Sequence, residues 1–265
     1  MQAELLTEVT PQQAARLIQD PNYGGQEKEN GKRRIIVRNG NEVFCFNREG
    51  EKRDLPPAVV RVILSHRLTR VIIDTELCGT KVAPRVRVFD ALIFGDELLG
   101  QRPYWFRLDR THEEFDNFHP MFFVLYTART SEEKLALVKK LYAENAEGMV
   151  FKRMDAVYKQ GRAGQHFKLK FWKDAEFVVI GPSPEGHDSV EIGVYKKNGK
   201  LHRVSGVSLI GRERVVAGDV ITVKYLYATK GLHIVQPVML QKRDDKQPKA
   251  CTVDQLVINR DMVIA

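Results

Sequence analysis

Alternating apolar and polar positions predict several strands in the first two-thirds of the chain. Apolar runs at Ile35 to Val37 and Val43 to Phe46 lie on either side of Asn39-Gly40, and this arrangement is typical of a β-hairpin. Further strands are predicted at Val71 to Ile73, Val86 to Phe94, Phe122 to Tyr126 and Met149 to Phe151.

Three local start signals predict helices among these strands. Thr10-Pro11 provides an N-cap and a proline at the first helical position, so a short helix should run to Ile18. Pro56-Pro57 opens a second helix that ends near Leu64. The capping box Thr130-Ser131-Glu132-Glu133 opens a third helix, which ends near Ala143. The first part of the chain is therefore mixed α+β.

The pattern changes after Asp174 to short strands separated by glycine turns. The predicted strands are Phe177 to Ile180, Val190 to Tyr195, Leu201 to Val207, Val220 to Leu226 and His233 to Val238. Five short strands in this length indicate a small barrel such as an OB-fold, and an edge extension of the first sheet is the alternative. We expect an α+β domain over residues 1–173, followed by an all-β OB-fold domain over residues 174–265.

Composition and charge narrow the class of protein. The chain has 265 residues, 43% of them hydrophobic, which suffices for real cores, and its net charge is +8. A basic surface suits a polyanion, so nucleic acid is the leading partner, and a merely basic protein without one is the alternative.

Three isolated cysteines without Cys-x-x-Cys spacing indicate neither a disulfide framework nor a zinc site. The sequence contains no apolar run near the length that spans a bilayer, and its start does not resemble a signal peptide. We expect a protein of the cytoplasm, or of the host cytoplasm if it is viral, with no membrane partner.

The segment Lys28-Glu29-Asn30-Gly31 offers a lysine as a nucleophile, followed by a glycine turn and the cations Lys32 and Arg33. An amine attacks phosphorus only when neutral, so burial or nearby cations must favour loss of its proton. Taken alone, a charged segment beside Asn-Gly is more often a solvated turn.

Carboxylates and lysines at strand ends could complete a phosphoryl-transfer site around Lys28. Glu76 closes one strand and Glu147 precedes another, and two such carboxylates could hold Mg²⁺. Lys168 and Lys170 alternate in strand period and therefore project from one face. Each feature by itself is also what an ordinary exposed strand shows.

Other nucleotide and hydrolase motifs are missing from the sequence. It contains no Gly-x-x-x-x-Gly-Lys-Ser/Thr, no Gly-x-Gly-x-x-Gly and no Gly-x-Ser-x-Gly, and its histidines lack metal-ligand spacing. A P-loop mechanism is thereby excluded, and the sequence gives no support for a Rossmann dinucleotide site or a nucleophile elbow.

In order along the chain, these pieces resemble the motifs of ATP-dependent DNA ligases, within the covalent nucleotidyltransferases that include RNA ligases and capping enzymes. The matching segments are Lys28-Glu29-Asn30-Gly31 with Arg33, Asn47-Arg48-Glu49-Gly50, Asp74-Thr75-Glu76-Leu77, Val88-Phe89-Asp90-Ala91-Leu92, Glu147-Gly148-Met149-Val150-Phe151-Lys152, Lys168-Leu169-Lys170 and Arg243-Asp244-Asp245-Lys246.

This resemblance implies a role for each matching residue. Lys28 would attack the α-phosphorus of ATP and carry AMP. Residues that would bind the nucleotide are Glu27, Arg33, Arg48, Glu76, Phe89, Lys168 and Lys170, with Phe89 stacked on adenine. Glu147 and Glu76 would hold Mg²⁺ or Mn²⁺. From the OB domain, Arg243, Asp245 and Lys246 would orient the pyrophosphate. The implied partners are ATP and nicked duplex DNA, and the implied state is a monomer.

Departures from the family pattern leave alternatives open. Asn30 replaces the usual Asp, Asn47 replaces Ser or Thr, and Thr75 replaces Gly. Because Lys-x-Asn-Gly also occurs among RNA ligases, an RNA ligase or capping-type enzyme is the first alternative, and an OB-containing nucleic-acid-binding protein without catalysis is the second. With 27 residues before Lys28, we expect a minimal two-domain enzyme.

Overall fold

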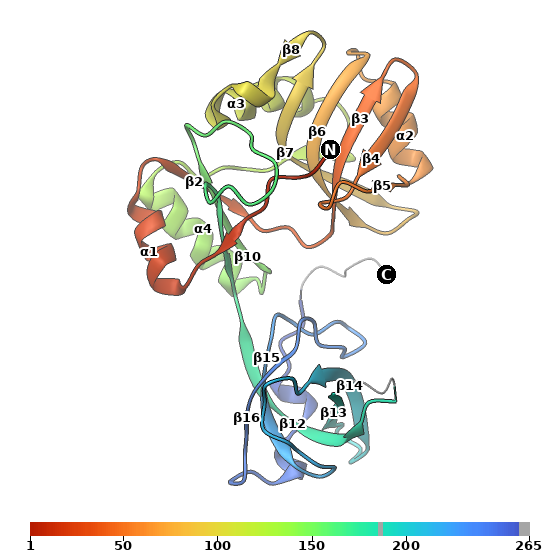
Figure 1. The fold of residues 1–265 in the computed structure, drawn as a ribbon, viewed down its shortest axis with the longest axis vertical. Coiled ribbons are helices and arrows are strands. Elements are labelled where there is room, and N and C mark those ends of the chain that lie inside the picture. Colours follow the sequence, from red (N-terminus) through yellow and green to blue (C-terminus); the bar gives the residue numbers. More distant parts are fainter. Residues whose placement is uncertain (185–187, 260–265) are drawn as a thin grey trace. The chain divides into compact units, whose positions relative to one another are not determined.

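The computed structural model describes residues 1–184 and 188–259, and the chain divides into two compact units (Figure 1). The first unit is Met1–Leu169 and the second begins at Lys170. No helix within the described ranges is long and apolar enough to cross a membrane.

The larger sheet of the first unit has the order β5-β4-β3-β6-β7-β8, and β9 pairs in parallel with β7. Its strands are β3 (Lys32–Asn39), β4 (Glu42–Phe46), β5 (Lys52–Arg53), β6 (Arg70–Gly79), β7 (Pro84–Phe94), β8 (Glu97–Leu98) and β9 (Phe122–Val124). Asn39 pairs with Glu42, and Gly40 in the turn has φ +60°, as a tight hairpin requires. The predicted hairpin is confirmed.

The smaller sheet of the first unit has the order β1-β11-β10-β2. Its strands are β1 (Thr7–Glu8), β2 (Tyr23–Glu27), β10 (Gly148–Arg153) and β11 (Phe167–Lys170). β2 and β10 are antiparallel, with Glu27 opposite Met149. This register decides which residues meet at the ends of the two strands.

Helices cover both sheets of the first unit. α2 (Pro57–Leu64) and α3 (Tyr104–Phe115) pack on the larger sheet, and α1 (Pro11–Gln19) and α4 (Ser131–Ala143) pack on the smaller one. The caps predicted for α1 and α4 are present, since the hydroxyls of Thr10 and Thr130 accept from the backbone N–H three residues on. All three predicted helices are confirmed. α3, which is rich in aromatic residues, is an additional helix that was not predicted.

The core of the first unit lies between the larger sheet and its helices. Most of the aromatic side chains around α3 belong to it, and Tyr104 and Phe115 are fully buried. Trp105 is an exception and is exposed on the helix surface.

The second unit is a curled antiparallel sheet of order β14-β13-β12-β15-β16 (Figure 1). Its strands are β12 (Lys173–Pro182), β13 (Ser189–Tyr195), β14 (Leu201–Ser208), β15 (Val220–Tyr225) and β16 (Val238–Lys242). Short 3-10 helices lie at Pro248–Ala250 and Val253–Gln255 in this unit, and another lies at Leu99–Gln101 in the first unit. A mixed α+β unit followed by a β-rich unit is the fold class that the sequence predicted.

The prediction for the last strand was wrong. It placed a strand at His233 to Val238, but β16 begins at Val238, because Leu232 and Gln236 adopt positive φ angles of 68° and 54°. Non-glycine residues in that conformation interrupt a strand. Residues 232–236 therefore form an irregular segment with one isolated bridge, between Ile234 and Ala228, instead of a strand.

Candidate active site

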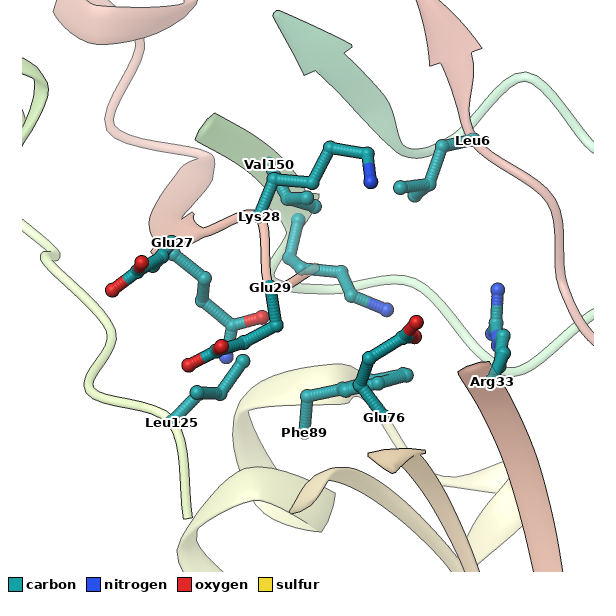
Figure 2. A pocket seen from close by; sticks show the side chains of 11 residues that line it. Leu6, Glu27, Lys28, Glu29, Arg33, Glu76, Phe89, Leu125 and Val150 are labelled. Atoms are coloured by element: carbon teal, nitrogen blue, oxygen red, sulfur yellow. The ribbon is translucent and has the colours of Figure 1, made fainter. Parts of the chain in front are cut away.

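A pocket in the first unit gathers side chains from both of its sheets (Figure 2). Gln26 and Glu27 end β2, Lys28 and Glu29 follow it, and Val150 and Lys152 come from β10. From the larger sheet come Arg33, Glu76 and Phe89, and Leu6 and Leu125 complete the lining. The hollow is about 460 Å³ when its open mouth is included.

Lys28 is held beside Glu147 by the pairing of β2 with β10. The Lys28 N–H donates to the carbonyl of Gly148 at 3.0 Å, and Lys28 Nζ lies 2.5 Å from Oε1 of Glu147. Glu147 is 6% exposed and Lys28 is 20% exposed. The amine therefore lies in a sheltered pocket and not in bulk solvent.

Arg33 is fixed at the other side of the pocket by a second carboxylate. Its Nε and Nη2 donate to the two oxygens of Asp74 at 2.8 and 2.6 Å, and its Nη1 donates to the carbonyl of Glu4 at 2.5 Å. Burial acts to lower the pKa of Arg33, but Asp74 outweighs it and raises the pKa. Arg33 is thus a fixed cation in the pocket wall.

Glu76 is opposite Arg33 in the register of β3 and β6. Its burial raises its pKa to about 7, although Lys28 and Arg33 act to lower it and Glu147 adds a further increase. The cations of this pocket therefore compensate the burial of the Glu76 carboxylate only in part.

Phe89 presents its ring to the pocket between two cations. The guanidinium carbon of Arg33 lies 5.2 Å from the ring centroid and Lys152 Nζ lies 5.4 Å from it. Lys152 is 3% exposed, and burial lowers its pKa while Asp90 and Glu4 oppose this shift. Cations over a ring face are attracted by its π electrons, so both side chains help to fix the ring.

A buried layer behind Phe89 fixes its backbone. Asp90 receives hydrogen bonds from Nε and Nη2 of Arg107 at 2.7 and 2.8 Å, with both side chains fully buried. The Tyr104 hydroxyl donates to the carbonyl of Phe89 at 2.8 Å and accepts from the amide of Gln26 at 2.9 Å. These bonds connect the ring-bearing strand to β2, which ends next to Lys28.

The pocket thus brings together five residues singled out from sequence, Glu27, Lys28, Arg33, Glu76 and Phe89, and Glu147 joins them through Lys28. Three others do not line it. Arg48 is 70% exposed and pairs with Glu49, and Lys168 Nζ lies 4.0 Å from Glu8. Lys170 belongs to the second unit, where it donates to Gln236 at 2.7 Å.

Lys152 lines the pocket together with Lys28 and Arg33. In the sequence it was named only as the last residue of the motif that begins at Glu147. Its signal was available, because residues two apart on a strand face the same side and Val150 also lines the pocket. The role of Asp74 depends on contact with Arg33 across two strands, which no local pattern reveals.

In the second unit, Arg243 and Asp245 form a local cluster just after β16. Arg243 donates to both oxygens of Asp245 at 2.7 Å and to Glu176 at 3.0 Å. Hydrogen bonding from Arg243 lowers the pKa of Asp245 to about 2. Lys246 is exposed beside this pair.

Among the described residues, no group of three or more His, Cys, Asp or Glu side chains is arranged to hold a metal ion. Glu147 and Glu76, the two carboxylates predicted from the sequence to hold a metal, both interact with Lys28 and offer two side chains with oxygen donors, not a complete protein cage. Mg²⁺ is commonly bound in this way, through one or two carboxylates with substrate phosphates and water.

Comparison with known proteins supports the motif pattern. No family model matches the sequence. The chain is 24% identical over 252 residues to DNA ligase C1 of Mycolicibacterium smegmatis, with 78% of this chain and 70% of that protein covered.

Two solved structures show the same fold. A Lig E DNA ligase, described as binding DNA with a minimal scaffold, matches 92% of this chain and 99% of its own, with a TM-score of 0.63 and 18% identity. A mycobacterial DNA ligase D in complex with ATP matches 95% and 97%, with a TM-score of 0.55 and 18% identity. The chain has the fold of the ATP-dependent DNA ligases, as the resemblance implied.

Proposed function

We propose that the chain is an ATP-dependent DNA ligase that seals nicks through an AMP-lysine intermediate at Lys28. The observation that carries this proposal is the position of Lys28, which shares one pocket with Phe89, Arg33 and Glu76 and is paired with Glu147. Such a pocket has an amine nucleophile, an aromatic surface for a base, and fixed cations for phosphate. The likeness to DNA ligase C1 and to the ligase structures supports the same function.

In the first step, Lys28 forms a bond from nitrogen to the α-phosphorus of ATP, and the bond from that phosphorus to the pyrophosphate oxygen breaks. The amine must first give up its proton, because only the neutral form has a free electron pair. Glu147 is the carboxylate nearest to Lys28 and orients it in the pocket. Phe89 stacks on adenine, and Arg33 contacts ribose or phosphate.

Glu147 and Glu76 fit a divalent cation because both supply carboxylate oxygens that are sheltered from solvent. Burial raises the pKa of Glu76 to about 7, so the nearby cations do not fully offset the burial of its negative charge. Bound there, Mg²⁺ or Mn²⁺ would neutralise phosphate charge as the leaving group departs. The orientation of Lys28 does not depend on such a cation, because Glu147 and the carbonyl of Gly148 hold the lysine directly.

The remaining residues implied by the family stay proposals. Arg48, Lys168 and Lys170 would grip phosphate, and Arg243, Asp245 and Lys246 would orient the pyrophosphate from the second unit. We place the functional boundary near Lys173, with adenylation by residues 1–173 and an OB-fold in residues 174–265. Closure of the OB domain over the pocket would complete the site, as conformational closure does in many enzymes.

AMP would then pass from Lys28 to the 5′-phosphate of a nick, and the adjacent 3′-hydroxyl would displace it. The net charge of +8 suits a grip on the DNA backbone, so the affinity should fall steeply as salt rises from low to moderate concentration. An affinity that stays flat over that range would contradict the grip. We further propose that the protein acts as a monomer in the cytoplasm, where its three free cysteines stay reduced.

Nick sealing with ATP, GTP and NAD compared side by side tests the proposal. The expected result is sealing of nicked duplex DNA with ATP alone, and no sealing by Lys28→Ala. Preference for single-stranded RNA would favour the RNA ligase or capping alternative. Binding of nucleic acid without AMP transfer would favour the OB-containing binding protein.

A further inference from the structure

Four side chains form a row across the larger sheet, and the row continues beyond the pocket. In the pairing of the strands, Arg33 is opposite Glu76, Glu76 is opposite Arg87, and Arg87 is opposite Phe123. Residues paired in this way project from the same face of a sheet. Arg33 and Glu76 line the pocket, so Arg87 and Phe123 extend its face toward β9.

Phe123 is the exposed member of a strand that is otherwise buried. It is 51% exposed, while Phe122 and Val124 on either side are 3% exposed and pack in the core. The guanidinium carbon of Arg87 lies 5.0 Å from the centroid of its ring. A large apolar ring backed by a cation thus faces outward on the same face as the pocket.

Arg87 connects this ring to the segment that carries Lys28. Its Nε lies 3.2 Å from Oε1 of Glu29, the residue after Lys28. Figure 2 shows Glu29 and Leu125 on the side of the pocket away from Arg33, and Leu125 is two residues after Phe123. The ring is therefore positioned next to the mouth of the pocket and not on a remote surface.

Arg85 adds a second cation to this face. It is two residues before Arg87 on β7, so it projects from the same side, and it is exposed. An aromatic ring with guanidinium groups around it matches a nucleotide, because the ring stacks on a base while the cations attract its phosphates. Nucleic acid supplies both features in every nucleotide, whereas a protein partner would need acidic side chains placed beside an apolar contact to match this face.

We propose that Phe123, supported by Arg87, is a stacking shelf for the terminal nucleobase of the DNA strand end that is processed at Lys28. This inference rests on the proposed ligase function. The shelf holds the base outside the pocket while its phosphate reaches the pocket. Arg87 is a positioning residue, since it fixes the ring and the Glu29 segment together.

A fluorescent base placed at the nick tests the shelf. Nicked duplexes carry 2-aminopurine at the 3′-hydroxyl terminus, at the 5′-phosphate terminus, or one helical turn away, and each is titrated with the full chain. Stacking on Phe123 should change the fluorescence at the 5′-phosphate terminus and not at the 3′-hydroxyl terminus or the distant position, because the 5′-phosphate is the group that receives AMP from Lys28.

Phe123→Leu keeps an apolar side chain but removes the aromatic ring. It should abolish the terminal fluorescence change and weaken binding of nicked DNA by about tenfold, and Phe123→Trp should restore both. Tyr142→Ala, at an equally exposed tyrosine on α4, is the matched control and should behave as wild type. Thermal melting of each variant checks its fold.

A terminal fluorescence change that persists in Phe123→Leu, or equal changes at terminal and distant positions, would overturn the shelf. Failure of the ligase function itself would look different, because wild-type protein incubated with ATP would then gain no AMP at Lys28. Loss of affinity in Phe123→Leu without a fluorescence change in wild type would assign Phe123 a merely structural role and would also overturn the proposal.

Discussion

The two regions of the molecule that carry motifs differ in how their charged side chains are paired and how far they are exposed to solvent. In and behind the pocket of the first unit, carboxylates and cations are largely buried and paired between different elements, as Asp74 of β6 is with Arg33 of β3 and Asp90 of β7 is with Arg107 of α3. In the second unit, Arg243 pairs with Asp245, only two residues away, and Asp245 is 66% exposed. The first arrangement depends on the whole fold, whereas the second is largely local.

Because of this difference, a mutation in one region should change the stability of the domain, whereas a mutation in the other should change mainly its activity. A buried charge that loses its partner must be accommodated without water, so the whole domain is destabilised. An exposed charge is resolvated when its partner is removed. Mutations in the pocket should therefore impair stability and activity together, whereas mutations after β16 should affect activity alone.

The largest effect is expected when Asp90 is replaced. Asp90→Ala leaves the guanidinium of Arg107 buried without its partner, so the free energy of unfolding should fall by about 3–5 kcal/mol. The matched change Asp245→Ala in the exposed cluster should leave it nearly unchanged, because the Arg243 charge that remains is resolvated. Urea unfolding followed by circular dichroism measures both. Equal losses would show that the comparison between the regions is mistaken.

A smaller effect is expected at the ring of the pocket. Phe89→Leu keeps the packing behind the strand but removes the stacking surface, and the loss of base stacking should weaken ATP binding by about 1–3 kcal/mol. Calorimetric titration with ATP measures it, and Phe44→Leu, at an aromatic residue of β4 in the same sheet, is the control. An unchanged ATP affinity in Phe89→Leu would show that adenine does not stack on Phe89.

The smallest effect is a pH dependence in the exposed cluster. The pKa of Asp245 is lowered from 3.8 to about 2 by hydrogen bonds from Arg243. Because the folded pKa is the lower one, the stabilisation is fully present above pH 3.8 and is lost as the pH falls toward 2. Nuclear magnetic resonance titration of the Asp245 carboxyl, with Arg243→Gln as the comparison, should show the pKa returning to its ordinary value. A titration unaffected by Arg243→Gln would mean that the pair does not form in solution.

Local signals in the sequence predicted the elements that depend on a few neighbouring residues. The N-caps Thr10 and Thr130 and the Asn39-Gly40 turn correctly placed two helices and a hairpin. The misplaced last strand shows the limit of this approach, because apolar alternation at residues 233–238 does not reveal that Gln236 adopts a positive φ.

The sequence predicted which residues belong to the site better than it predicted how those residues are arranged. Motif order identified Lys28 and Glu147, but their contact follows from the register of β2 with β10, which joins segments about 120 residues apart and has no local signature. Lys152 was within reach of the alternation rule, whereas Asp74 and Asp90 became visible only through their arginine partners.

The most direct test of the account is the mass of the intact protein after incubation with ATP and Mg²⁺. The account predicts a gain of one AMP that peptide mapping places on Lys28 and that disappears in Lys28→Ala. The matched variant Lys32→Ala, four residues on and exposed, should still gain AMP. No gain in the wild type, or a gain that survives Lys28→Ala, would contradict the account.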